Sequence, residues 1–167
     1  MKQNLNISLQ PFNKKKDYDL LIKWISSPHI SEWWGDPAKN IKEMSEPATG
    51  GGEALIKTNS QSVGYIRWQI PSQEDLQAAG LDDLPDSVVD IDIAIGEKNY
   101  LGRGIAPKAI QLLINRILTS KNVPMIMMCT SINNTKAIKS FEKAGFTRNR
   151  IFADPEHGDM WLLTITP

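Results

Sequence analysis

The chain has 167 residues, of which 41% are hydrophobic, and its formal net charge is zero. This length suits one unit that buries its own core, so we expect a single domain over residues 1–167. No apolar run approaches the roughly 20 residues that span a bilayer, and the neutral charge argues against a nucleic-acid binder. We expect a soluble, cytoplasmic monomer or homodimer.

The single cysteine, Cys129, excludes an internal disulfide, and two scattered histidines supply no dense metal cluster, so no metal is expected.

The hydrophobic periodicity predicts an alternation of strands and helices along the chain. In chain order we expect a strand over 5–12, a helix over 17–27, a short helical or irregular segment over 28–35 and a short helix over 39–44. Strands over 53–58 and 63–70, joined by a hairpin turn at 59–61, come next, then a helical turn at 76–79 within an acidic loop and a strand over 88–95. A helix ending near 120, a buried strand over 124–129, a helix over 133–144, and paired strands over 146–153 and 160–165 complete the chain. This order predicts an α/β fold with a mixed sheet, and neither repeats nor a linker divide it.

The sequence Lys98-Asn-Tyr-Leu-Gly-Arg-Gly-Ile-Ala-Pro-Lys108 joins a β-branched strand to an amphipathic helix. Unpaired backbone amides and the positive end of the helix dipole favour a phosphate at such a helix start. Pro107 suits the first turn, where its missing N–H costs no intrahelical bond. The spacing matches neither the P-loop nor the dinucleotide-binding fingerprint. We therefore interpret this glycine turn as a phosphate site of another kind, or else as a tight connection.

The charges are sorted along the chain, although they sum to zero. Residues 68–97 contain eight acidic residues and no basic one, whereas residues 98–150 contain ten lysines and arginines and one acid, Glu142. If the two segments build opposite ends of one cleft, their field would draw a polyanion to the glycine turn and a cation to the other end. The alternative is that both segments are solvated faces.

Two motifs together resemble the GNAT superfamily of acyl-CoA-dependent N-acyltransferases: Leu101-Gly-Arg-Gly-Ile-Ala106 and, after one buried strand, Asn134-x-x-Ala137-x-x-x-Phe141-Glu-Lys-Ala-Gly-Phe146. The resemblance implies a mixed, mostly antiparallel central sheet flanked by helices, with acetyl-CoA as the donor. It places the pyrophosphate on the amides around Gly102 to Ala106, the pantetheine beside the strand that ends at Ile95, and a hydrogen bond from Asn134 to the pantetheine. The implied donor-binding residues are Ile93, Ala94, Ile95, Leu101, Gly102, Arg103, Gly104, Ile105, Ala106, Asn134, Ala137 and Phe141.

Within that superfamily, His29-Ile-Ser-Glu-Trp-Trp-Gly35, Gly64-Tyr65 and Ile91-Asp92 resemble the aminoglycoside 6'-N-acetyltransferases. The resemblance implies that Asp92 is the catalytic base at the acceptor amine, which must be neutral to attack a thioester. Asp90 shares its face of the strand, so either carboxylate, or the pair, could serve. The implied acceptor-binding residues are Glu32, Trp33, Trp34, Tyr65, Asp90 and Cys129.

The chain departs from the family pattern at four positions. Leu101 replaces the usual Arg or Gln, and Pro107 removes one backbone donor. Phe141 stands where a tyrosine often protonates the departing thiolate, so CoA would leave as the thiolate or take its proton from water. Cys129 falls where the resistance enzymes carry a second acceptor-binding aspartate.

These departures leave other functions open. A GNAT enzyme for a different amine, of the siderophore-type lysine or ribosomal-protein N-terminal class, would suit Cys129, and a silent CoA-binding regulatory domain would suit Phe141. Trp33 and Trp34 could line a cleft or fill the core, and His29 could be structural. Cys129 could be a nucleophile, although no Cys-His pair is evident, or a small apolar residue at a strand end.

Overall fold

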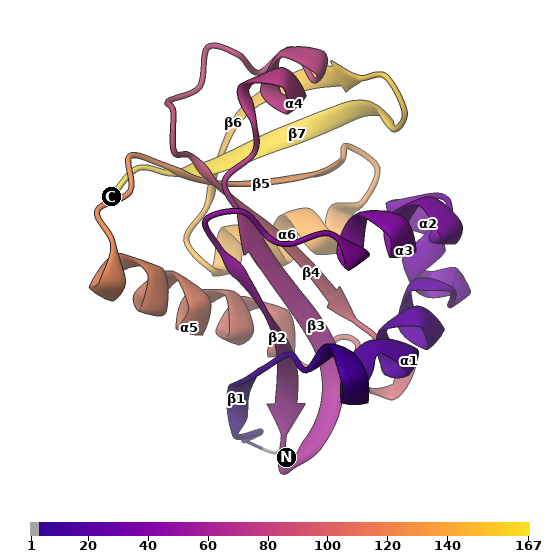
Figure 1. Ribbon diagram of the computed structural model, residues 1–167. Coiled ribbons are helices and arrows are strands. Elements are labelled where there is room, and N and C mark those ends of the chain that lie inside the picture. The colour runs from indigo at the N-terminus through magenta and orange to yellow at the C-terminus, as the bar shows by residue number, and fades with distance from the viewer. Residues whose placement is uncertain (1–3) are drawn as a thin grey trace.

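A computed structural model describes residues 4–167. One seven-stranded sheet, in the order β1-β2-β3-β4-β5-β7-β6, runs through the molecule (Figure 1). All neighbouring strands are antiparallel except β4 and β5, which are parallel. The strands are β1 (Ile7–Pro11), β2 (Gly52–Thr58), β3 (Gln61–Gln69), β4 (Val89–Ile95), β5 (Ile126–Ser131), β6 (Thr147–Asp154) and β7 (Gly158–Ile165). The mixed, mostly antiparallel sheet predicted above is confirmed.

Helices cover both faces of this sheet. They are α1 (Lys14–Ile25), α2 (Pro28–Trp34), α3 (Pro37–Ser45), α4 (Gln73–Ala78), α5 (Ile105–Ser120) and α6 (Thr135–Lys143), with a short 3-10 helix, η1 (Lys98–Tyr100), before α5. The predicted start of α1 was three residues late. The Asn13 side chain accepts hydrogen bonds from the Lys15 and Lys16 N–H groups, and Asp17 accepts one from Asn13, so the helix begins directly after Asn13.

Local sequence explains the sharpest boundaries. The β2–β3 hairpin turns at Asn59 and Ser60, which both have positive φ (49° and 72°), as a two-residue turn that matches strand twist requires. Helix α6 ends with the Phe146 N–H bonded to the Phe141 carbonyl and the Gly145 N–H bonded to the Glu142 carbonyl. This is the Schellman arrangement, and Gly145 supplies its left-handed residue with φ 108°.

The two faces carry separate cores. Helices α5 and α6 pack on one face, where Ile110, Leu113 and Phe141 join the sheet residues Ile66 and Ile91. Helices α1, α2 and α3 lie together on the other face, over Leu55, Tyr65 and Ala94 (Figure 1). A third cluster, around Leu76, Leu81, Val88, Met127 and Leu162, seats α4 and its loop. No helix among residues 4–167 is long and apolar enough to cross a membrane.

Strands β4 and β5 separate soon after they meet. Their register pairs Val89 with Ile126 and Asp90 with Met127, and no further pair joins the two strands within the described residues. The sheet is therefore split between β4 and β5, and this split positions the site described next.

Candidate active site

A cavity of about 930 Å³ runs from the face covered by α2, α3 and α4, past the end of β4, to the starts of α5 and α6. Residues of these elements or their N-caps, and of β5, line it; they include Trp33, Glu43, Asp75, Asp92, Cys129, Gly104 and Asn134. The segment of mostly acidic charge and the segment of mostly basic charge thus meet in one cavity. Of the two interpretations of the charge pattern, the structure favours the single cleft.

Beyond its short pairing with β5, strand β4 offers main-chain groups to the cavity. The Val89 N–H donates to the Met125 carbonyl of the segment entering β5. The main-chain N–H and C=O groups of the odd-numbered residues of β4 therefore point toward β5. Beyond Asp90, Ile93 and Ile95 therefore direct their polar groups into the gap, and both residues line the cavity. His29 Nε2 lies 3.1 Å from the Ile95 oxygen, which gives His29 a hydrogen bond at this edge. An extended ligand that contains amide groups could form hydrogen bonds along this edge, in the way that an additional strand pairs with the edge of a sheet.

The glycine turn is open and left-handed. Gly102 and Gly104 both have φ 74°, and a Cβ added at either would meet nothing within 4 Å. Gly104 is the N-cap residue of the 16-residue helix α5, and no side chain caps that end, so the Ile105 and Ala106 N–H groups remain for a ligand. Leu101, Gly102, Gly104, Ile105 and Ala106 line the cavity.

Arg103 differs from its neighbours in this turn. Its guanidinium lies 4.9 Å from the centre of the Tyr100 ring, and its side chain is exposed and does not line the cavity. The guanidinium of Arg103 thus lies near the Tyr100 ring, and its role in donor binding stays a prediction.

Helix α6 forms the other wall of this end. Asn134 Oδ1 accepts a hydrogen bond from the Ala137 N–H at 3.3 Å, so the side chain caps the helix and leaves its Nδ2 group to donate. Ala137 and Phe141 line the cavity, although Phe141 is also part of the core. Three lysines that sequence reasoning counted only as charge, Lys136, Lys139 and Lys143, line it as well. Their spacing of three and four residues could have assigned them to one helix face.

The opposite end of the cavity holds a carboxylate pair. Asp90 and Asp92 lie on one face of β4, opposite Gln69 and Arg67 of β3. Burial raises the pKa of Asp92 to about 6; the charge of Arg67 lowers it and that of Glu43 raises it. Burial, and then the neighbouring Asp92 charge, raise the pKa of Asp90 well above its usual range. Asp92 therefore changes its protonation state close to neutral pH, as a general base requires.

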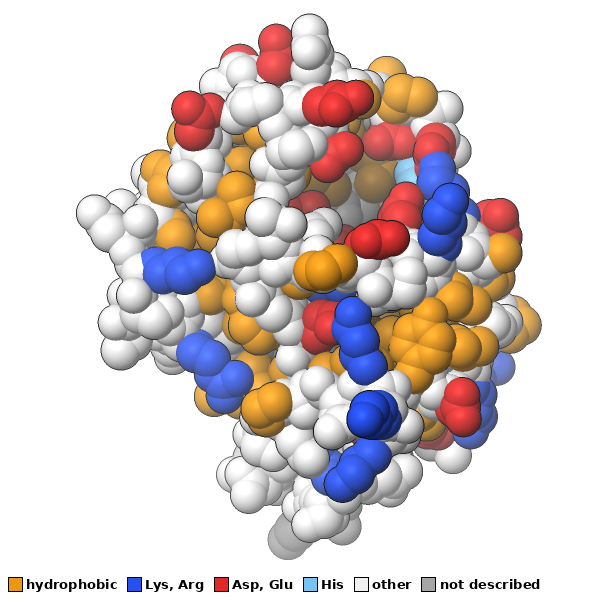
Figure 2. All heavy atoms as spheres, viewed as in Figure 1, with side chains coloured by type: hydrophobic (Ala, Val, Ile, Leu, Met, Phe, Trp, Pro, Cys, Tyr) orange, Lys and Arg blue, Asp and Glu red, His pale blue; other side chains and the backbone are white. Residues whose placement is uncertain are grey.

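Further acidic side chains surround this pair. Glu32, Glu43, Asp75 and Asp154 also line the cavity. Figure 2 shows acidic side chains gathered around a hollow in the upper part of the face in view. Of these four, only Glu32 was predicted. Asp75 belonged to the acidic segment, but Glu43 and Asp154 reach the site from a helix and a hairpin far from β4 in the sequence.

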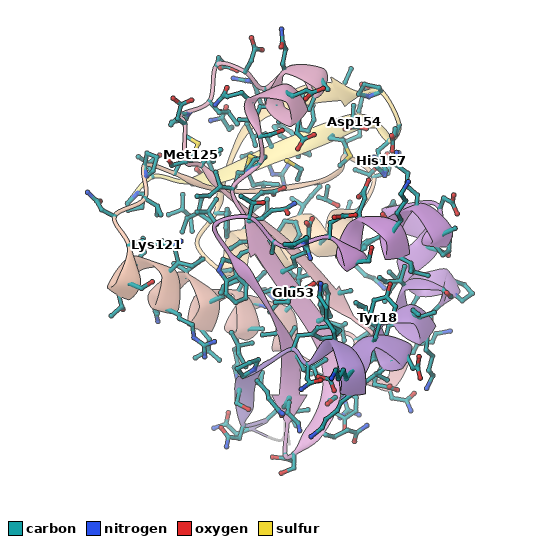
Figure 3. The ribbon with its side chains drawn as sticks, viewed as in Figure 1. Tyr18, Glu53, Lys121, Met125, Asp154 and His157 are labelled. Carbon is teal, nitrogen blue, oxygen red and sulfur yellow. The ribbon has the colours of Figure 1, made fainter. Side chains whose placement is uncertain are left out.

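The β6–β7 hairpin closes one side of this end. His157 Nδ1 lies 3.0 Å from Asp154 Oδ1 and its Nε2 lies 3.3 Å from the Trp34 oxygen, while Lys39 and Glu156 form an ion pair. Figure 3 shows Asp154 and His157 together near the tip of the hairpin, on the side of α2 and α3. The hairpin thus fixes the segment that carries the adjacent tryptophans.

Trp33 and Trp34 are both half-buried and both line the cavity. Trp34 also packs against the core beneath α1–α3, so the two predicted roles coincide in this residue. Cys129 lines the cavity too, and burial together with the charges of Asp90 and Asp92 raises the pKa of its thiol. A neutral thiol is a poor nucleophile, so the structure disfavours that interpretation.

The prediction that Tyr65 contacts the acceptor was wrong. Tyr65 has no exposed surface and does not line the cavity. Its hydroxyl donates to Glu53 Oε1 at 2.6 Å, and Phe12 packs edge-on against its ring. The alternation of β3 placed Tyr65 on the correct face of the sheet, but α1–α3 cover that part of the face.

Comparison with known proteins decides the family. A family model described as an acetyltransferase (GNAT) domain matches residues 13–153. The chain belongs to the GNAT acetyltransferase family. It is therefore an acetyl-CoA-dependent acyltransferase, as the two motifs predicted.

Named relatives of this GNAT chain share a modest identity with it. Aminoglycoside N(6')-acetyltransferase type 1 of Klebsiella pneumoniae is 25% identical over 162 residues, which cover 88% of this chain and 77% of that protein. The crystal structure of aminoglycoside acetyltransferase AAC(6')-Ib with coenzyme A and kanamycin superposes with a TM-score of 0.79 at 24% identity, covering 96% of this chain and 95% of the other. The aminoglycoside N(6')-acetyltransferase of Legionella pneumophila gives a TM-score of 0.77 at 21% identity, covering 98% and 94%.

The residues present fit a bound CoA. An open glycine turn at the start of α5, a row of lysines on α6 and the unpaired edge of β4 suit its phosphates and its amide-containing arm. Within residues 4–167, no group of three or more metal-ligating side chains gathers in a way that could hold a metal ion.

Proposed function

We propose that this GNAT protein transfers an acetyl group from acetyl-CoA to a primary amine of a small polycation, the 6'-amine of an aminoglycoside. The observation that carries the proposal is a single cavity with a half-buried carboxylate pair at one end and an uncapped helix start, suited to an anion, at the other. The relatives named above support the choice of acceptor. Because acetyl-CoA is the donor, a cytoplasmic location is part of the proposal. The expectation of a single domain over 1–167 is kept as a further part of it.

Asp92 is the general base in this mechanism. The acceptor arrives as an ammonium ion, and the carboxylates of Asp90 and Asp92 would hold it by charge-assisted hydrogen bonds. Asp92 then takes the proton, directly or through water, and the neutral amine attacks the thioester carbonyl. No covalent enzyme intermediate forms, because both substrates occupy the cavity together.

Main-chain groups of β4 would stabilise the charge that develops on the carbonyl oxygen. Ile93 and Ile95 face the gap, where a fixed N–H group can donate to that oxygen without reorganisation. Phe141 has no proton to give, so the sulfur leaves as the thiolate or is protonated by water. The amides of the glycine turn and Asn134 anchor the donor while this happens.

The acceptor end accounts for a substrate with several amines. Glu32, Glu43, Asp75 and Asp154 add four carboxylates around the Asp90–Asp92 pair, so more than one ammonium group can be matched at once. Cys129 stands where the resistance enzymes carry a second acceptor-binding aspartate, and Asp90, whose charge acts on Cys129, would supply a second carboxylate there. The half-buried indoles of Trp33 and Trp34 offer flat walls for a sugar ring or a cation.

One pH dependence follows from this assignment. We expect kcat/KM to fall about tenfold for each pH unit below the pKa of Asp92, which is about 6, because only the ionised carboxylate accepts the proton. Initial rates between pH 5 and 8, at an acceptor concentration well below KM, would show this limb. A profile that stays flat down to pH 5 would contradict Asp92 as the base.

Release of CoA measured with a panel of amines tests the acceptor. Kanamycin-type aminoglycosides should be turned over with the highest kcat/KM. The observation of Cys129 in place of a carboxylate favours one rival, a GNAT enzyme for a lysine side chain or a protein N-terminus, and that rival predicts the reverse order. Binding of acetyl-CoA without turnover of any amine would instead indicate a regulatory domain.

A further inference from the structure

A buried arginine lies beneath the acceptor end of the cavity. Arg67 of β3 is 2% exposed, and the strand register places it directly between Glu53 of β2 and Asp92 of β4. Figure 3 shows Glu53 on β2, the second strand from one edge of the sheet. Three neighbouring strands thus carry a row of alternating charge, carboxylate, guanidinium, carboxylate, of which only Asp92 lines the cavity.

The guanidinium is held by groups other than Asp92. Its Nη1 donates to Glu53 Oε1 at 2.6 Å. Its Nη2 donates to the main-chain carbonyl oxygen of Glu46 at 2.9 Å and to Gln69 Oε1 at 3.4 Å. Tyr65 donates to the same Glu53 oxygen. Among the described hydrogen bonds none joins Arg67 to Asp92, so Arg67 acts on that carboxylate through space, from a fixed position.

The charges around Asp92 are unbalanced without this arginine. Asp90 on the same strand and Glu43 on α3 are both acidic, and Cys129 on β5 carries a neutral thiol. Among residues 4–167, Arg67 is the one cation that acts on Asp92 from a neighbouring strand of the sheet. A buried charge also costs desolvation free energy, and a plain structural contact between β2 and β3 would not require one.

We propose that Arg67 is a positioning residue that keeps the Asp92 carboxylate ionised while the acceptor site is empty, and that Glu53 opposes this effect by neutralising part of the guanidinium charge. The proposal rests on the proposed function, because it explains how the assigned base is available at neutral pH. The charge of Arg67 lowers the pKa of Asp92 against the effect of burial, which agrees with the geometry.

Two substitutions that remove opposite charges test the proposal. Arg67→Gln removes the cation, and Glu53→Gln removes the anion while its amide oxygen still accepts the hydrogen bonds from Arg67 and Tyr65. The titration of Asp92 is followed by carboxyl 13C NMR of the protein without substrates, with the Asp92 signal assigned by its loss in Asp92→Asn. The acidic limb of kcat/KM is recorded in parallel.

Arg67→Gln should raise the Asp92 midpoint by about one pH unit or more, and Arg67→Lys should return it toward the wild-type value. Glu53→Gln should not raise it. If Arg67→Gln alone fails to fold around an unpaired Glu53, the double variant Glu53→Gln/Arg67→Gln buries no charge and should still raise the midpoint. The pair would be purely structural, and the proposal overturned, if both single variants raise the midpoint alike or if neither variant lacking Arg67 raises it.

The NMR readout separates this proposal from the proposed function. A raised midpoint in a protein that turns over no amine would retain the role of Arg67 in the charge state of Asp92 and refute the acetyl transfer. An unchanged midpoint in an active enzyme would refute the role of Arg67 alone.

Discussion

Asp92→Asn should lower kcat/KM for the acceptor amine by a factor of about 10² to 10⁴, the range that general-base catalysis contributes. Asparagine keeps the shape of the side chain and one acceptor oxygen, so the acceptor is still held, but the amide cannot take the proton. The loss should therefore appear mainly in kcat, while the KM for acetyl-CoA stays close to the wild-type value. Steady-state rates of CoA release at pH 7.5 measure both parameters.

Asp82→Asn provides the matched control for this substitution. Asp82 belongs to the same acidic segment, but it is exposed and lies outside the cavity. It should retain wild-type activity, which separates a loss of catalysis from a general change in the charge of the segment. If Asp92→Asn were as active as Asp82→Asn, Asp92 would not be the base, and Asp90→Asn would be the next variant to measure.

Gly104→Val should raise the KM for acetyl-CoA by about 10-fold or more. Gly104 has φ 74°, a conformation that costs an L-amino acid roughly 1–2 kcal/mol and a β-branched one more. The loop must shift to relieve this strain, and the Ile105 and Ala106 N–H groups then lose their alignment with the phosphate. A loss of 1.4 kcal/mol corresponds to about tenfold in affinity. Isothermal titration with CoA measures the same effect without turnover.

Gly80→Val is the control for backbone strain. Gly80 has φ 71°, and, as at Gly104, a Cβ there meets nothing within 4 Å. It follows α4 and does not line the cavity. Both variants should therefore lose similar stability in thermal unfolding, and only Gly104→Val should lose affinity for CoA. Equal affinities in the two variants would remove the glycine turn from the donor site.

The fold could be predicted from the sequence because its signals are local. The end of α6 before Gly145 and the glycine turn each depend on a few neighbouring residues, and the structure has both where expected, whereas α6 begins two residues later than predicted because Asn134 caps it. The start of α1 was missed because Asn13 precedes three lysines, and the apolar face that suggested a later start begins only at Leu20.

The site was less predictable, because it depends on which segments cover which part of the sheet. Alternation along β3 places Tyr65 and Arg67 on the same face as Asp92, yet only the packing of α1–α3 shows that both are buried beneath the cavity. Glu43 and Asp154 come from distant segments and carry no local signal. The row Glu53–Arg67–Asp92 appears only once the register of β2, β3 and β4 is known.

We propose that this cavity passes an acetyl group directly to an aminoglycoside amine. Incubation of the protein with kanamycin and acetyl-CoA labelled with 13C in the acetyl group tests it most directly, with the product read by mass spectrometry and NMR. We expect a single labelled acetyl group on the 6'-nitrogen, formed rapidly by the wild-type protein and slowly by Asp92→Asn. Kanamycin recovered without label from a folded protein that binds acetyl-CoA would contradict it.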